Sequence, residues 1–176
     1  GISFEEIKEL LSSKIHEERL CALLVLVEQF KKADEAGKKK VFEFYLQNSR
    51  FANNWDLVDL SADKIAGEYL LSRDKSVLFG LAASENLWKR RIAVVSTFAF
   101  IKKNRFNETF QIAEQLLSDR HDLIHKAVGW MLREAGKRDE AALEVFLKEN
   151  FKKMPRTMLR YAIERLPEKK RKAFLL

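Results

Sequence analysis

The segment KRRIAVVSTF at residues 89–98 decides the fold, because its pattern returns along the whole chain. It joins charged residues to an apolar run whose spacing fits one face of a helix. Similar segments occur about 35 to 40 residues apart, a spacing typical of helical-hairpin repeats: EERLCALLVL (17–26), NWDLVDLSA (54–62), IHKAVGWML (124–132) and TMLRYAIERL (157–166). Each repeat pairs a long helix with a shorter one, which bury their apolar faces by stacking on neighbours into a curved solenoid. An irregular helical bundle is the alternative, and the regular spacing favours the solenoid.

Helical periodicity extends over all 176 residues, and only two prolines and six glycines interrupt it. Helices are predicted over residues 3–12, 17–32, 38–47, 55–71, 75–82, 87–103, 107–117, 122–135, 140–150, 156–164 and 168–174. We therefore expect residues 1–176 to form a single all-α domain, a right-handed solenoid of HEAT-like helical repeats. The opening GISFEEIKELL begins as if within a longer protein, and we expect the chain to be the C-terminal three-quarters of it.

The composition, 47% hydrophobic and 34% charged, is that of a folded chain. The 33 Lys and Arg exceed the 26 Asp and Glu, and the formal net charge of +7 favours a polyanionic partner such as nucleic acid or a membrane surface. No apolar run is long enough to cross a membrane, and no secretory signal is evident. The single cysteine, Cys21, excludes an internal disulfide and lies in an apolar run, where we expect it buried in a reducing, cytoplasmic compartment.

Trp55 and Asp59 are four residues apart and share one face of the helix predicted over residues 55–71. Ala62 and Ala66 extend this face with small side chains, beside a second stripe that faces the core. An edge tryptophan and a solvated aspartate are the simple interpretation of this pair. A functional site is the alternative, and the remaining repeats decide between them.

Stacked repeats bring equivalent positions together along one surface. Trp55, Arg91 and Trp130 are about one period apart in corresponding helices, so one groove can hold two aromatic rings, the carboxylate of Asp59 and a guanidinium. Two structural alternatives stay open from the residues alone. Asp59 and Arg91 could form only a salt bridge between repeats, and both tryptophans could pack in the core.

Three motifs carry a resemblance to a known family: NNWDLVD, ENLWKRRIAVVS and IHKAVGWMLREAGKRD. They resemble, in order and over nearly the whole chain, the DNA alkylation repair family of alkylpurine DNA glycosylases, which are built from HEAT-like repeats. The resemblance implies excision of N3- and N7-alkylated purines from double-stranded DNA without a metal or a cofactor. Members usually carry further N-terminal helices that help hold the DNA, and this chain lacks most of that region.

The resemblance also implies roles for individual residues. Asp59 matches the catalytic aspartate, and Trp55 matches the first active-site tryptophan. Arg91 is the arginine of the W-x-x-R pattern, and Trp130 in GWMLRE matches the second active-site tryptophan. Trp88, the first residue of W-x-x-R, is assigned to packing.

Short basic clusters recur about once per repeat and end at Lys40, Arg91, Arg105, Arg156 and Lys172. Their repetition fits a stripe that follows a phosphate backbone. We assign further DNA contacts to Lys89, Arg90 and Lys126. No arrangement for reading bases is evident, as expected for a repair enzyme.

Three other polar residues are given structural interpretations. Asp56 falls in the first turn of its predicted helix, where its charge favours the helix start. His121 and His125 have the i, i+4 spacing of metal ligands, but no third ligand accompanies them and we predict no metal site.

The sequence thus predicts a monomeric DNA glycosylase that acts on cationic alkylpurines in duplex DNA and associates with the nucleoid. The competing interpretation is a non-catalytic repeat scaffold that binds DNA or protein. A metal-dependent nuclease would need a carboxylate or histidine cluster that the sequence does not contain.

Overall fold

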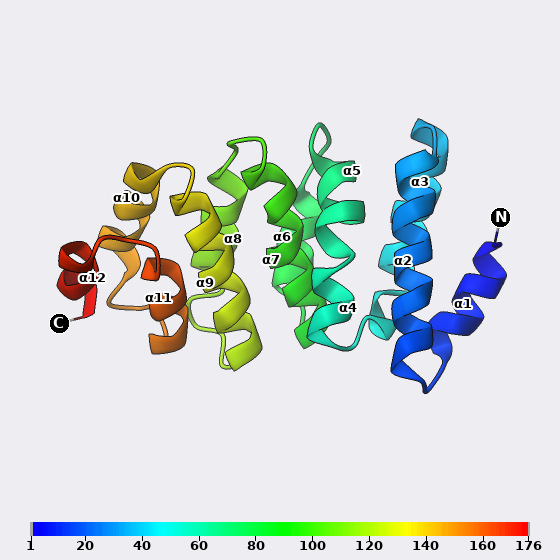
Figure 1. Cartoon of the computed structure of the whole chain (residues 1–176), viewed down its shortest axis with the longest axis horizontal. Coiled ribbons are helices and arrows are strands. Elements are labelled where there is room, and N and C mark those ends of the chain that lie inside the picture. Colours follow the sequence, from blue (N-terminus) through cyan, green and yellow to red (C-terminus); the bar gives the residue numbers. More distant parts are fainter. Residues whose placement is uncertain (1, 176) are drawn as a thin grey trace.

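The computed structural model describes residues 2–175, which form helices and their connections without a β-strand (Figure 1). The helices succeed one another in a row from one end of the molecule to the other, so the chain is an elongated all-α solenoid (Figure 1). The elements are α1 (Phe4–Ser12), α2 (His16–Lys32), α3 (Glu35–Gln47), η1 (Ser49–Phe51), α4 (Trp55–Asp59), η2 (Asp63–Gly67), α5 (Glu68–Leu70), α6 (Ser76–Ala82), α7 (Leu87–Ile101), α8 (Asn107–Gln115), α9 (Asp122–Gly136), α10 (Glu140–Asn150), α11 (Arg156–Ile163) and α12 (Glu168–Leu175).

The core is continuous from one repeat to the next. Helix α7 packs against α4 and η2 on one side and against α9 on the other, and α9 packs in turn against α11. Leu57, Ile92 and Ala127 follow one another at intervals of 35 residues on α4, α7 and α9, and each side chain is fully buried. Each helix therefore depends on its neighbours for the burial of its apolar face, as a solenoid requires.

Polar contacts also connect consecutive repeats. Lys102 Nζ lies 2.8 Å from Asp63 Oδ2, across 39 residues of sequence, and Arg105 Nη1 donates to the carbonyl oxygen of Leu71 across 34 residues. These separations equal about one repeat. The structure confirms the predicted all-α solenoid.

In the described part of the chain, six helices begin after a residue whose side chain accepts a backbone N–H: α1, α3, α4, α7, α9 and α10. Ser3 forms a capping box with Glu6 at the start of α1. Asp34 accepts a hydrogen bond from the backbone N–H of Gly37, so α3 begins at Glu35 and not at residue 38 as predicted. The short 3₁₀ turn η1 was not predicted.

The helix predicted over residues 55–71 is wrong in one respect, since the structure divides it. Helix α4 ends at Asp59, and the π-helical turn η2 separates it from the short helix α5. At the break, the hydroxyl of Ser61 donates to the carbonyl oxygen of Leu57 at 2.6 Å and lies 3.0 Å from the hydroxyl of Tyr45. Such a bond back to the preceding turn bends a helix.

This break changes which side chains face the surface. Ala62 and Ala66 were expected to share a face with Trp55 and Asp59, but both alanines are fully buried. The break leaves Trp55 and Asp59 at the surface while the segment that follows enters the core against α7.

The expected burial of Cys21 is also wrong, because its side chain is exposed on α2. The core face of α2 is formed by Ala22, Leu23, Leu26, Val27 and Phe30, which leaves Cys21 on the opposite side. Neither α2, with its 17 residues, nor any other helix within residues 2–175 is long and apolar enough to cross a membrane.

Candidate active site

One surface cleft of about 360 Å³ receives side chains from four successive parts of the solenoid, α4, α7, α9 and α11. It is lined by Trp55, Asp59, Arg91, Leu123, Lys126, Trp130, Arg133 and Tyr161. The structure thus brings together the four residues on which the family resemblance rests. The cleft is open to the surface and is not an enclosed pocket.

Asp59 and Arg91, which both line the cleft, form a bidentate ion pair. Arg91 Nε donates to Asp59 Oδ1 at 2.9 Å, and Arg91 Nη2 donates to Asp59 Oδ2 at 2.8 Å. The third interaction of this guanidinium goes to the carbonyl oxygen of Leu123 at 2.5 Å. The Arg91 side chain is only 6% exposed and that of Asp59 is 16% exposed, so the pair is fixed in orientation while the carboxylate remains within reach of the cleft.

Trp55 is the first residue of α4 and its side chain faces solvent. Asn54 caps the helix by accepting a hydrogen bond from the backbone N–H of Trp55 at 2.8 Å. Trp55 is 53% exposed, although large apolar residues usually lie inside. The alternative that Trp55 belongs to the core is therefore wrong.

Trp130 is partly buried and is held by contacts behind the cleft. Its ring lies 5.8 Å from that of Phe98, centroid to centroid, at an angle of 45°. Lys102 Nζ lies 4.8 Å from the centroid of Phe98 and is ion-paired with the buried Asp63. The core alternative is thus half right for Trp130, which packs on α7 and also lines the cleft.

Of the three further residues assigned to DNA, only Lys126 lines the cleft. Its ammonium lies 2.7 Å from Asp122 Oδ2, one turn earlier on α9. The hydrogen bond that Lys126 donates to the Asp122 carboxylate raises the pKa of Lys126, so this lysine stays charged.

Arg90 and Lys89 lie outside the cleft. Arg90 Nε donates to Asp119 Oδ2 at 2.6 Å, and Arg90 Nη1 donates to the carbonyl oxygens of Ser84 and Glu85. Arg90 thereby connects the start of α7 to the segment before α9. The structure gives it a structural role, and its contact with DNA stays a prediction, as does that of Lys89.

The first of the predicted basic clusters is neutralised locally. On α3, Lys38 pairs with Glu35 and Lys39 pairs with Glu43. The cluster ending at Lys40 thus adds little to a basic stripe. The stripe predicted along all repeats stays a prediction. Most of the Lys and Arg residues lie in the C-terminal half of the chain, from residue 89 onward.

The residues that the sequence assigned to structural roles are Trp88, Asp56, His121 and His125, and each of them makes a contact within the fold. Trp88 is partly buried against the core. Asp56 lies in the first turn of α4, and its Oδ2 lies 2.7 Å from His16 Nε2 of α2. His121 caps α9 by accepting from the N–H of Leu123, and His125 Nε2 lies 2.6 Å from the carbonyl oxygen of Asp119.

Sequence reasoning missed three residues of the cleft: Leu123, Arg133 and Tyr161. A signal for Tyr161 was present, because Arg91, Lys126 and Tyr161 are each 35 residues apart. Leu123 contributes through a backbone carbonyl, which a sequence pattern of side chains does not reveal.

The fold and the cleft define a class of protein: an all-α solenoid with two tryptophans around a carboxylate–arginine pair on a basic chain. Residues 2–166 match the family described as "DNA alkylation repair enzyme". The chain belongs to this family, which gives it a role in DNA repair with DNA as its substrate.

A solved structure has a similar fold. It is described as a "Predicted DNA alkylation repair enzyme from Enterococcus faecalis", with a TM-score of 0.74 and 19% sequence identity. The similarity covers 93% of this chain and 75% of that chain, and at this identity it supports the fold alone. A search among curated proteins gave no match.

Proposed function

We propose that the protein is a DNA glycosylase that hydrolyses the N-glycosidic bond of N3- and N7-alkylated purines in double-stranded DNA. The observation that carries this proposal is the carboxylate of Asp59, held by two charge-assisted hydrogen bonds in an open cleft between two tryptophans. The family supplies the DNA and the repair role.

Hydrolysis of this glycosidic bond needs little more than a carboxylate beside the sugar. Alkylation at N3 or N7 makes the purine cationic, so the C1′–N bond breaks with its electron pair leaving on a base that becomes neutral. The sugar develops oxocarbenium character, and a carboxylate beside it stabilises the positive charge and accepts a proton from the attacking water. The water oxygen forms the new bond to C1′. We assign both tasks to Asp59.

The two tryptophans suit a cationic substrate. The negative ring faces of Trp55 and Trp130 attract a base and sugar that carry positive charge, with about 0.5–2 kcal/mol for each contact. Phe98 behind Trp130 fixes the direction of that ring. The open cleft supports a lesion that stays largely within the duplex, in contrast to the deep pockets of enzymes that flip the base.

Asp59→Asn tests the proposal. The substitution preserves the shape of the side chain but removes its charge, and we expect base release to fall by about 10²-fold or more. The measurement is single-turnover release from a duplex with one 7-methylguanine. Asp63→Asn is the matched control, because Asp63 lies one turn further along, is also ion-paired and does not line the cleft. Its rate should stay near that of the unmodified protein.

The second candidate function is a non-catalytic scaffold that binds DNA. One observation favours it: the Asp59–Arg91 pair also braces the repeats, because Arg91 contacts both α4 and α9. If the unmodified protein binds duplex but releases no base, the scaffold is the better description. Release of base by Asp59→Asn at an unchanged rate would instead remove the catalytic role from Asp59 and leave its ion pair with Arg91 as a brace between repeats.

A further inference from the structure

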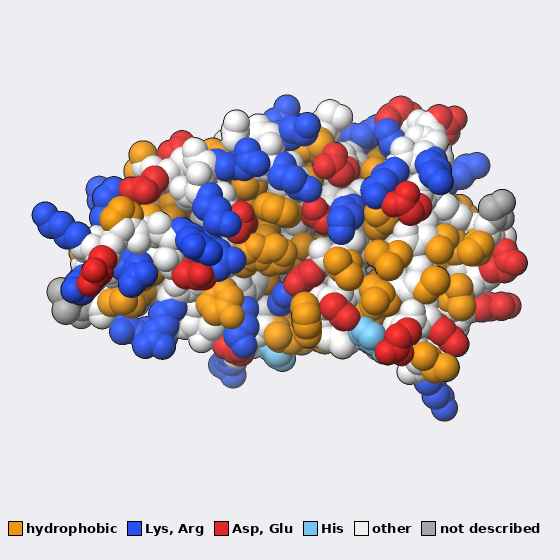
Figure 2. Space-filling view, in the orientation of Figure 1, with side chains coloured by type: hydrophobic (Ala, Val, Ile, Leu, Met, Phe, Trp, Pro, Cys, Tyr) orange, Lys and Arg blue, Asp and Glu red, His pale blue; other side chains and the backbone are white. Residues whose placement is uncertain are grey.

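The positive charge of the protein is concentrated in its C-terminal half. Residues 1–88 contain 12 Lys and Arg against 15 Asp and Glu, whereas residues 89–176 contain 21 against 11. Figure 2 shows the same division on one face, where blue side chains gather over the C-terminal repeats and orange side chains over the N-terminal ones. A polyanion is therefore attracted mainly to the repeats from α7 onward.

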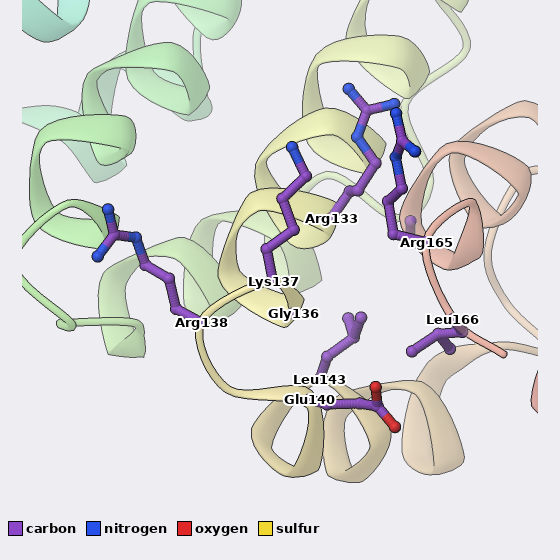
Figure 3. Close-up of a pocket in the computed structure, with 9 residues that line it drawn as sticks. Arg133, Gly136, Lys137, Arg138, Glu140, Leu143, Arg165 and Leu166 are labelled. Atoms are coloured by element: carbon purple, nitrogen blue, oxygen red, sulfur yellow. The ribbon is translucent and has the colours of Figure 1, made fainter.

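A second cavity of about 390 Å³ lies within this basic half, between the end of α9, the start of α10 and the end of α11. Arg133, Lys137 and Arg165 extend from its rim in one direction, whereas Arg138 points away from them (Figure 3). We call this cavity the Arg165 pocket. Leu143 and Leu166 form apolar parts of its lining.

The cations of the Arg165 pocket outnumber the carboxylates that pair with them. Glu164 is bound to Arg133 and lies 3.9 Å from Arg165 Nε, and Glu134 lies 2.7 Å from Lys137 Nζ. Three cations thus share two carboxylates, one of which is half exposed. Lys137, Arg165 and Glu164 are the exposed members of these pairs, and ion pairs of exposed side chains contribute little.

Arg133 adds an unused donor to this excess of charge. Its Nε is buried without a hydrogen-bond partner among residues 2–175, and it lies 3.7 Å from Glu134 Oε1. Arg133 also lines the active-site cleft, so the cleft and the Arg165 pocket adjoin at this side chain. Lys137 follows Trp130 by seven residues, which corresponds to about 10 Å along α9.

We propose that the Arg165 pocket binds a backbone phosphate of the duplex, about 10 Å from the position of the lesion beside Trp130. This inference rests on the proposed function for the position of the lesion. The phosphate oxygens accept hydrogen bonds from Lys137 and Arg165, the way in which phosphates are commonly held. The pocket contacts no base, so it orients the duplex without reading its sequence.

The test is a comparison of two double variants in the full chain. Lys137→Ala with Arg165→Ala should weaken binding of an undamaged duplex by roughly threefold to tenfold and lower the slope of log K against log salt by about 1. Lys148→Ala with Lys153→Ala removes the same charge from two exposed side chains, on α10 and in the turn after it, that do not line the pocket. This control should change affinity much less.

Each other outcome overturns the proposal. Equal weakening in both double variants would mean that only the overall charge matters. Unchanged binding in the first variant would remove the pocket from the DNA path. If the Lys137→Ala with Arg165→Ala variant no longer bound inorganic phosphate in a calorimetric titration but kept its affinity for the duplex, the pocket would be a site for a free phosphate compound.

The proposed function is checked separately from this inference. Base release by the unmodified protein and by Asp59→Asn decides the glycosylase proposal, whereas the pocket is decided by binding of an undamaged duplex alone. If the unmodified protein releases no base, the glycosylase proposal fails while the binding comparison on undamaged duplex still decides the pocket.

Discussion

Arg91 makes three hydrogen bonds that serve structure and site at once. Two go to Asp59 on α4 and one goes to the backbone of Leu123 on α9, so a residue of α7 connects the repeats on both sides. A buried arginine is suited to this because its planar fork of donors matches a carboxylate. Orientation of the proposed catalytic carboxylate is thus a by-product of how the repeats are held together.

The tryptophans give a prediction at the residue scale. Trp55→Phe and Trp130→Phe each keep an aromatic face but weaken cation–π attraction. We expect release of cationic 7-methylguanine to slow by about fivefold, equivalent to roughly 1 kcal/mol. Release of a neutral lesion of similar shape should hardly change.

Stability is the control for these variants. The melting temperature of Trp55→Phe should equal that of the unmodified protein, because Trp55 is exposed. Equal slowing on cationic and neutral lesions would show that the rings act through shape and not through charge.

The positions of whole helices set the width of the cleft. Helix α9 carries Trp130 and its neighbour α11 carries Tyr161, and both side chains line the cleft. These helices approach closely at Gly129, where a Cβ atom would lie 2.5 Å from Tyr161 Cβ and 2.6 Å from the carbonyl oxygen of Met158. A glycine one residue before Trp130 thereby determines how near α11 comes to the site.

Gly129→Ala tests this at the element scale. The added methyl group forces α9 and α11 apart, and we expect a loss of about 1–3 kcal/mol of stability together with slower base release. Gly80→Ala is the matched control, because it lies within α6 and its new methyl group would meet nothing within 4 Å. That change should raise stability by about 0.4–1 kcal/mol. Similar melting temperatures for the two variants would contradict the close packing of α9 on α11.

The whole molecule presents a basic C-terminal half beside a slightly acidic N-terminal half. Repeat proteins of this shape offer a long surface to an extended ligand, and a duplex is such a ligand. The uneven charge orients the duplex before any specific contact forms, because electrostatic attraction acts at a distance.

Salt dependence is the prediction at this scale. Binding of an undamaged duplex should weaken linearly in log K against log salt, with a slope near −0.9 for each phosphate neutralised. Anisotropy titrations at several salt concentrations would measure it. A flat response would show that the +7 charge belongs to a solvated surface and not to a binding face.

Much of the fold could be predicted from local pattern. Apolar periodicity located most of the helices, because the spacing of apolar residues in an amphipathic helix indicates which face is buried. The regular recurrence of these helices predicted the solenoid. The four motif residues of the cleft followed from the family resemblance. Asp34 and Ser61 show the limit of this approach, since a cap moved one helix start and a side-chain bond divided one predicted helix.

The sequence by itself determined the helical repeats and the basic composition. Its motifs also selected four candidate site residues, Trp55, Asp59, Arg91 and Trp130. Only the tertiary structure decided that Cys21 is exposed, that Arg90 is bound to Asp119 and that Tyr161 faces the cleft. The physical reason is distance along the chain. Helix formation depends on residues three or four apart, whereas each of these outcomes depends on which neighbour about one repeat away lies against the helix.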